Sequence, residues 1–256
     1  MLSSIYFLFN LKPMKMEVNI LEVIAVKLDQ SLQVAKMQTL LNYIDSEKQS
    51  RIKSFYRYED KERCLIGDIL VRYMLASYLR ICPQEINFSH NEFGKPYLKE
   101  YPLYFNLSHS GYWVVAVLDT NENGIDVQEM GDVDLALAER FYSKREYIEL
   151  LGMKGNQRAH LFYDLWTLKE CYIKTAGKGL SLSLDSIILE RIDSSIYKSY
   201  LKEKEIYLKL YHLDSSYKLA VSSDSGCFEN LKVLTLEELY TLFMVSLKTP
   251  ALINGK

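Results

Sequence analysis

Excess charge of either sign is missing from this sequence, and so are tracts of low complexity. Its 31 Lys and Arg residues nearly balance 33 Asp and Glu residues, giving a net charge of −2 at pH 7. Non-specific binding of nucleic acid needs a net basic surface, so that class of function is not supported. Disorder is not expected outside the chain ends. The 256 residues, 48% hydrophobic and 25% charged, suit one large or two small globular domains.

Features of secreted and membrane proteins are also scarce. None of the four cysteines form a C-x-x-C pair, which argues against a disulfide framework and against a zinc site. No stretch is long and apolar enough to span a bilayer. We therefore expect a cytoplasmic protein with reduced thiols at Cys64, Cys82, Cys171 and Cys227.

The N-terminal segment "MLSSIYFLFNLKPMKM" has an apolar run but lacks a leading positive charge and a clear small-residue cleavage site. A signal peptide is therefore not expected. A strand-like segment begins directly afterwards, which makes Met14 or Met16 a candidate for the true start. Residues 1–18 are interpreted as an N-terminal extension.

Alternation and helical periodicity predict a mixed α+β protein. Helices are expected at 31–44, 45–80, 132–151 with a break at Ser143, 158–176 and 234–244. Strands are expected at 19–28, in pairs within 85–98 and 103–118, and at 121–130, 180–192, 205–213 and 217–222.

A weak internal repeat suggests that this α+β unit is duplicated. "FGKPYL" follows one long helix and "GKGLSL" follows another, while "FNLSHSGYWVVAV" is similar to "YHLDSSYKLAV". With a seam near 119–124, the halves are 19–122 and 123–245, followed by a tail at 246–256.

Two oxygen-bearing side chains share one face of the strand "GIDVQ". Alternate residues of a strand point the same way, so Asp126 and Gln128 project together while Ile125 and Val127 enter the core. Such a pair beside a glycine suits Mg²⁺, which takes few protein ligands. A solvated strand face is the alternative, and for this pentapeptide alone it is favoured.

The helix at 158–176 carries Glu170 and Lys174 one turn apart, away from its apolar stripe. These two residues could form only an exposed ion pair, which would stabilise the helix by about 0.2–0.5 kcal/mol. Glu170 could instead complete a metal site with Asp126. In "FYSKREY", Ser143 and Glu146 have the spacing of a capping box, and a functional Glu146 would have to face the same site.

Several residues are candidates for binding phosphate. The turn "NLSHSG" offers Ser108 and His109 beside free backbone N–H groups, although these residues also favour turns for local reasons. No G-x-S-x-G elbow is present, so a serine hydrolase is not indicated. The cations that could surround a polyphosphate, each more often a solvated charge, are Lys48, Arg51, Arg63 and Lys95.

The motifs "FGKP", "FNLSHSG", "GIDV", "RFYSKREY" and "LWTLKECYIKTAGKGLSLSLDSI" together resemble the 4′-phosphopantetheinyl transferases, of the surfactin-synthetase-activating type. The resemblance runs from about Ile20 to Leu239. It implies two similar α/β halves related by a pseudo-twofold axis in a pseudodimeric monomer. The active site would lie in the cleft between them, holding coenzyme A and Mg²⁺. The implied reaction transfers 4′-phosphopantetheine to a serine of an apo acyl or peptidyl carrier protein, leaving adenosine 3′,5′-bisphosphate.

The resemblance also implies roles for individual residues. Metal ligands would be Asp126 and Glu170, with Gln128 as a third oxygen ligand; coenzyme A contacts would be Lys48, Arg63, Lys95, Ser108 and His109; pyrophosphate contacts would be Lys169 and Lys174. Glu146 matches an acidic position near the metal, and either Glu146 or Glu170 would accept the serine proton. The carrier would dock on residues 130–144 through Leu135, Leu137, Phe141 and Tyr142, unless these belong to the core.

Two departures from the family pattern stand out. Gln128 occupies a position where Glu is common, which removes one negative charge, and Cys64 replaces a hydroxyl residue. Gln128 is the one feature that favours a degenerate, noncatalytic homologue that binds carrier proteins or coenzyme A. A metal-dependent phosphodiesterase or nuclease is a further rival, but it would need a basic groove and more acidic ligands.

Overall fold

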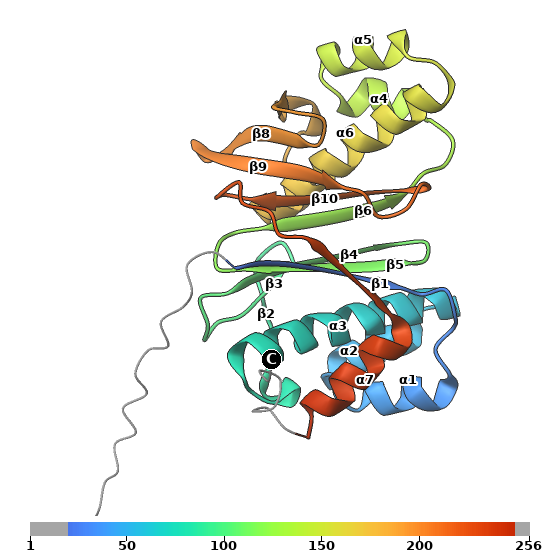
Figure 1. Ribbon diagram of the computed structural model, residues 1–256, viewed down its shortest axis with the longest axis vertical. Helices are drawn as coiled ribbons and strands as arrows, with labels where there is room; N and C mark the ends of the chain where they lie inside the picture. Colours follow the sequence, from blue (N-terminus) through green and yellow to red (C-terminus); the bar gives the residue numbers. More distant parts are fainter. Residues whose placement is uncertain (1–19, 249–256) are drawn as a thin grey trace, which may run out of the picture.

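The computed structural model describes residues 20–248. Two β-sheets lie against each other, and a long helix packs on the outer face of each sheet (Figure 1). The protein is therefore α+β with two sheet-containing halves, as predicted. The extension at 1–18 and residues 249–256 of the predicted tail lie outside the described residues.

The first half contains a four-stranded sheet in the order β11-β1-β5-β4. Its strands are β1 (Leu21–Lys27), β4 (Tyr104–Ser110), β5 (Trp113–Asp119) and β11 (Leu231–Thr235). Its helices are α1 (Val34–Leu41), α2 (Ser46–Ser54), α3 (Tyr58–Leu79) and α7 (Leu236–Ser246). A 3₁₀ turn, η1 (Pro83–Glu85), and a short hairpin of β2 (Ser89–His90) and β3 (Pro96–Tyr97) connect α3 to β4.

The second half contains a five-stranded antiparallel sheet in the order β6-β10-β9-β8-β7. The strands are β6 (Gly124–Glu129), β7 (Glu190–Arg191), β8 (Ile196–Leu201), β9 (Lys204–Tyr211) and β10 (Tyr217–Ser223). The helices are α4 (Leu135–Phe141), α5 (Lys144–Gly152) and α6 (Gly155–Ala176), with 3₁₀ turns η2 (Gly179–Ser181) and η3 (Leu184–Ser186).

Strand alternation produces the layered arrangement. Val23 and Val115 of the first sheet pack on Val127 and Val221 of the second, forming one apolar layer between the sheets. Their chain neighbours in β1 and β5 point the other way and form a second core with α3 and α7. The sheets are therefore buried on both faces near the centre of the molecule.

The C-terminal segment departs from the division expected at residue 123. β11 pairs in parallel with β1, from Val23 with Leu231 to Lys27 with Thr235. The following helix α7 buries Leu239 and Phe243 in the core of the first half. The chain therefore returns to the half in which it began (Figure 1).

The segment 180–192 was predicted as a strand and is mostly not one. It forms η2 and η3, and β7 covers only its last part, Glu190–Arg191. Strands β8 and β11 were not predicted at all. The predicted strand at 19–28 and the helix at 158–176 are confirmed as β1 and α6.

All four cysteines fall within the described residues and are free thiols. Between residues 20 and 248, no helix combines the length and the apolar character needed to cross a bilayer. Cys64 lies in α3, where burial raises the pKa of its thiol against the opposing effect of Lys48 and Arg51.

Candidate functional site

Ser108, Asp126 and Lys174 meet where β4 of the first half lies beside β6 and α6 of the second. Lys174 Nζ is 2.6 Å from Asp126 Oδ1 and 2.8 Å from Ser108 Oγ. The Ser108 hydroxyl donates to Asp126 Oδ1 at 2.9 Å and accepts the Val127 N–H at 3.3 Å. The one donor and two acceptor positions of this hydroxyl are thereby all occupied.

β6 presents Asp126 to α6 as the sequence predicted. Ile125 and Val127 are fully buried between the sheets, and the intervening Asp126 is 2% exposed on the opposite face. Gly124 allows α6 to come close, because a Cβ there would lie 2.3 Å from Cys171 O and 2.8 Å from Thr175 N. The backbone contact at Gly124 thus sets how near the α6 side chains come to Asp126.

Glu170 lies one turn before Lys174 on α6 and acts electrostatically on the same group of residues. Burial and the neighbouring Asp126 carboxylate raise the pKa of Glu170, while Lys174 lowers it. Gln128 Nε2 donates to Asp126 Oδ2 at 2.9 Å, so its amide lies on the same side of β6. We call Ser108, Asp126, Gln128, Glu170 and Lys174 the polar centre.

The polar centre fits a divalent metal that keeps most of its coordination sphere for substrate and water. Two carboxylates, of Asp126 and Glu170, lie close enough that burial and then the Asp126 charge raise the pKa of Glu170. The Gln128 side chain lies beside Asp126, to which its Nε2 donates, and its amide also carries a neutral oxygen that can bind a metal. Within residues 20–248 no group of three or more His, Cys, Asp or Glu residues could hold a metal. This donor set suits Mg²⁺, which commonly uses one or two carboxylates plus substrate phosphates.

A separate pocket in the first half contains two of the predicted cations. Lys48 and Arg51 of α2 line a cavity of about 420 Å³, together with His90 of the β2–β3 hairpin. Lys48 Nζ lies 3.6 Å from Asp68, whose other oxygen is taken by Arg72 at 2.6 Å. The sequence analysis did not select His90, although its position just before the "FGKP" turn was an available signal.

Arg63 and His109, both from the first half, lie near each other and near Lys174 of the polar centre. Arg63 of α3 donates to Gly111 O at 3.0 Å and to Asp60 at 2.6 Å. Desolvation and the cations Arg63 and Lys174 lower the pKa of His109, so its imidazole is neutral near pH 7. Phosphate binding by either residue stays a prediction.

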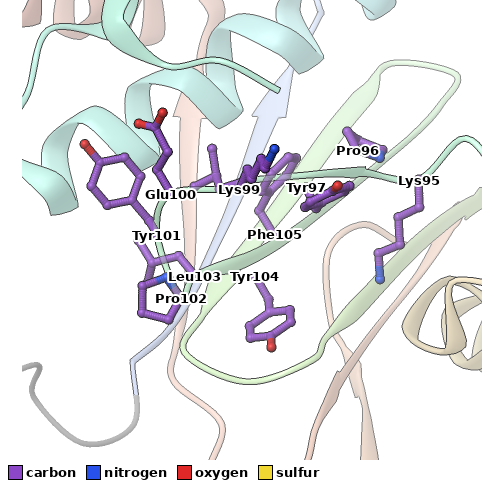
Figure 2. Close-up of a pocket in the computed structure, with 11 residues that line it drawn as sticks. Lys95, Pro96, Tyr97, Lys99, Glu100, Tyr101, Pro102, Leu103, Tyr104 and Phe105 are labelled. Carbon is purple, nitrogen blue, oxygen red and sulfur yellow. The ribbon is translucent and has the colours of Figure 1, made fainter. Parts of the chain in front are cut away.

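Lys95 is placed differently from the other predicted coenzyme A contacts. Its Nζ donates to Lys174 O at 2.6 Å, Asn123 O at 3.3 Å and Thr175 O at 3.4 Å. Burial lowers the pKa of Lys95 to about 8. Lys95 is one of residues 95–105, which line a pocket of about 450 Å³. Figure 2 shows its side chain at the end of this pocket opposite Glu100 and Tyr101.

Lys169 and Glu146 form a pair apart from the polar centre, and the predicted roles do not fit their positions. Lys169 is fully buried, and its Nζ donates to Leu184 O at 2.8 Å, to Ile187 O at 3.1 Å and to Glu146 Oε2 at 3.0 Å. The Glu146 carboxylate also accepts the Ser143 N–H at 2.7 Å, closing the capping box of α5. A buried, fully engaged ammonium cannot contact pyrophosphate, and Glu146 is not among the charges that act on Glu170.

We expect Lys169→Met to destabilise the protein by about 3–5 kcal/mol, because it leaves the buried Glu146 carboxylate unpaired. The free energy of unfolding, measured by urea titration, checks this. The double variant Lys169→Met/Glu146→Gln should recover part of the loss, since it leaves no buried charge. A single variant within about 1 kcal/mol of wild type would contradict the assignment of a buried ion pair.

The predicted docking segment is partly internal. Tyr142 is 3% exposed and its hydroxyl donates to Phe162 O at 2.6 Å. Phe141 packs edge-on against Trp166 at 6.0 Å between ring centroids. Leu135 and Leu137 are partly buried in the same cluster. Tyr142 therefore belongs to the core, which was the alternative to a docking role. Phe141 is partly buried against the same cluster.

Sequence reasoning missed Asn91 and Asn106, both inside or beside recognised motifs. Asn106 Nδ2 donates to Lys174 O at 3.2 Å and to Asn123 O at 3.3 Å, and Asn91 Nδ2 donates to Gly177 O at 3.0 Å. Asn106 lies two residues before Ser108 on β4, so strand alternation alone places it on the same face.

Comparison with known proteins covers most of the chain. A family model described as "4'-phosphopantetheinyl transferase, N-terminal" matches residues 32–121, and the model "4'-phosphopantetheinyl transferase superfamily" matches residues 122–222. The chain is 34% identical over 223 residues to the 4'-phosphopantetheinyl transferase Sfp of Bacillus subtilis, covering 86% of this chain and 100% of that protein.

More distant similarity is found as well. The 4'-phosphopantetheinyl transferase gsp of Aneurinibacillus migulanus is 32% identical, over 88% of this chain and 96% of that protein. Among solved structures, the holo-[acyl-carrier-protein] synthase of Thermotoga maritima matches with 23% identity and a TM-score of 0.34, covering 40% of this chain and 61% of that chain.

Proposed function

The chain belongs to the 4′-phosphopantetheinyl transferase superfamily, and from that membership we propose that it transfers the 4′-phosphopantetheine arm of coenzyme A to a serine hydroxyl of an apo carrier protein. The proposed reaction depends on Mg²⁺ and releases adenosine 3′,5′-bisphosphate. We infer that the protein binds coenzyme A and a carrier protein from its family and from the chemistry of the polar centre.

One observation carries the proposal. The Ser108 hydroxyl of the first half contacts two charged groups of the second half, the Asp126 carboxylate and the Lys174 ammonium. The three groups lie within 2.6–2.9 Å of one another. Each half alone would leave a buried polar group without its partner, which costs about 1–3 kcal/mol. The arrangement is therefore built across the two halves and provides cation and carboxylate side by side, as diphosphate chemistry requires.

The positions of the cations suggest how coenzyme A lies. Lys48 and Arg51 in the first-half pocket are suited to bind a terminal phosphate of the nucleotide. Arg63 and His109 follow towards the polar centre, where Lys174 is 28% exposed and available to the diphosphate. The pantetheine end would then extend past α6 towards the carrier.

In the proposed mechanism, Asp126, Glu170 and the Gln128 amide would hold Mg²⁺. Bound there, the ion would offset the negative charge of the diphosphate. When the diphosphate arrives, the Lys174 ammonium exchanges its contact with Asp126 for the phosphate oxygens and stabilises the leaving group. Of the two predicted bases, Glu146 is paired with Lys169, so Glu170 is assigned to accept the proton of the attacking serine.

The test is incubation of the protein with apo carrier proteins, coenzyme A and Mg²⁺, followed by mass spectrometry of the carrier. Transfer adds roughly 340 Da, the mass of the arm. A panel of fatty-acid, polyketide and peptide carriers identifies the acceptor class. Absence of the gain with every carrier, while coenzyme A still binds, would overturn the proposal in favour of a noncatalytic homologue.

Gln128→Glu is expected to lower the Mg²⁺ concentration for half-maximal turnover by about tenfold, because the added carboxylate raises the charge of the ligand set. Gln128→Met, which removes the oxygen without adding charge, should raise that concentration. Mg²⁺-dependent thermal shifts provide a second measurement. Equal half-saturation in wild type and Gln128→Glu would exclude residue 128 from the metal site.

A further inference from the structure

The C-terminal end of α6 is capped by side chains from the other half of the molecule. The last four carbonyls of a helix have no partner within the helix. Gly177, in the left-handed conformation at φ 64°, returns its N–H to Ile173 O. The next two carbonyls, of Lys174 and Thr175, are bound by Lys95 Nζ of the first half.

Lys95 and Asn106 converge on the same two carbonyl oxygens. Lys174 O accepts from Lys95 Nζ at 2.6 Å and from Asn106 Nδ2 at 3.2 Å. Asn123 O, just before β6, accepts from both donors at 3.3 Å. All three N–H groups of the Lys95 ammonium are used, so none is left for a phosphate. A cation at this position also complements the helix dipole.

We propose that Lys95 is a positioning residue: with Asn106 it clamps the end of α6 and the start of β6, and so fixes Lys174 and Asp126 relative to each other. This inference rests on the proposed transfer reaction. It replaces the expected coenzyme A contact of Lys95 with an action through the backbone. The residue whose carbonyl is clamped, Lys174, is the same one whose ammonium reaches Asp126 and Ser108.

The two roles predict different kinetics. A residue that binds coenzyme A should change KM, whereas loss of the clamp should misplace Lys174 and lower kcat. For Lys95→Met we expect kcat to fall by about 10- to 100-fold, with KM for coenzyme A within about twofold of wild type. Lys95→Arg, which keeps a cationic donor, should recover much of kcat. Lys99→Met, which removes an exposed ammonium from the same pocket-lining segment, is the matched control.

Amide hydrogen exchange of the protein without coenzyme A tests the clamp independently of transfer. In Lys95→Met, faster exchange should be confined to residues near the end of α6 and the start of β6. Asn106→Ala should act on the same amides with a smaller effect. The double variant should be non-additive in kcat, since both donors share two acceptors.

Three results would overturn the inference: a tenfold or greater rise in KM with unchanged kcat, exchange at α6 equal to wild type, or kinetics equal to those of Lys99→Met. If wild type transfers to no carrier, the proposed function fails. The exchange measurement then still decides whether Lys95 and Asn106 clamp α6.

Discussion

A Gly124→Ala protein is expected to lose transfer activity by about 100-fold and to be destabilised by about 1–3 kcal/mol. The added Cβ would lie 2.3 Å from Cys171 O, 2.4 Å from Thr175 Oγ1 and 2.8 Å from Thr175 N. Two of these atoms belong to the helix backbone, so no side-chain rotation relieves the contact. α6 must move away from β6.

The movement matters because Cys171 lies next to Glu170 and Thr175 lies next to Lys174. A shift of α6 therefore separates both side chains from Asp126, which stays on β6. Steady-state kinetics with a carrier protein and urea unfolding measure the two effects. Gly152→Ala is the matched control, because nothing lies within 4 Å of its Cβ position. Wild-type kcat in Gly124→Ala would show that the α6–β6 distance does not control the chemistry.

The parts of the site that depend on local periodicity could be predicted from sequence. Strand alternation placed Asp126 and Gln128 on one face, and the structure joins them by a hydrogen bond at 2.9 Å. The four-residue spacing of Glu170 and Lys174 on α6 places both side chains at the polar centre. These relations follow from the geometry of a single strand or a single helix turn.

Other roles depend on contacts between distant segments and could not be predicted in this way. Lys169 is the chain neighbour of Glu170, yet it points into the core, where the carbonyls of Leu184 and Ile187 receive it. Those carbonyls are available because this segment forms η3 and irregular backbone after it, not the expected strand. The helix alone therefore did not show which of two adjacent polar residues faces the site.

Long-range pairing explains the remaining differences. β11 has only one strand neighbour, β1, and most of its residues are at least partly exposed, so it lacks the apolar pattern of a buried strand. Its partner lies more than 200 residues earlier in the chain. The sequence "FGKP" likewise predicts a free cation at Lys95. Only the fold shows that its ammonium donates to carbonyls at the end of α6.

Glu170→Gln is expected to lower transfer by about 100-fold or more while raising the melting temperature of the metal-free protein. The loss of activity follows from removing a metal ligand and the proposed base. The gain in stability follows from the pKa of Glu170, which burial and the Asp126 charge raise in the folded state. Just above the ordinary pKa of Glu, the folded state then binds more protons than the unfolded state. The free energy of unfolding therefore falls as pH rises through this window.

Above this window the wild-type protein therefore carries a buried group whose ionisation opposes folding, and the neutral amide of the variant removes this cost. Thermal unfolding from pH 4 to 8 should show the two proteins converging at the acidic end and the variant more stable at neutral pH. Glu149→Gln, which makes the same change at an exposed position, should have the same melting temperature as wild type across this pH range. Added Mg²⁺ should stabilise wild type more than Glu170→Gln, because ligand binding stabilises the state that binds it. If the variant is less stable than wild type at pH 7 and Mg²⁺ stabilises both proteins equally, Glu170 stabilises the fold and does not bind the metal.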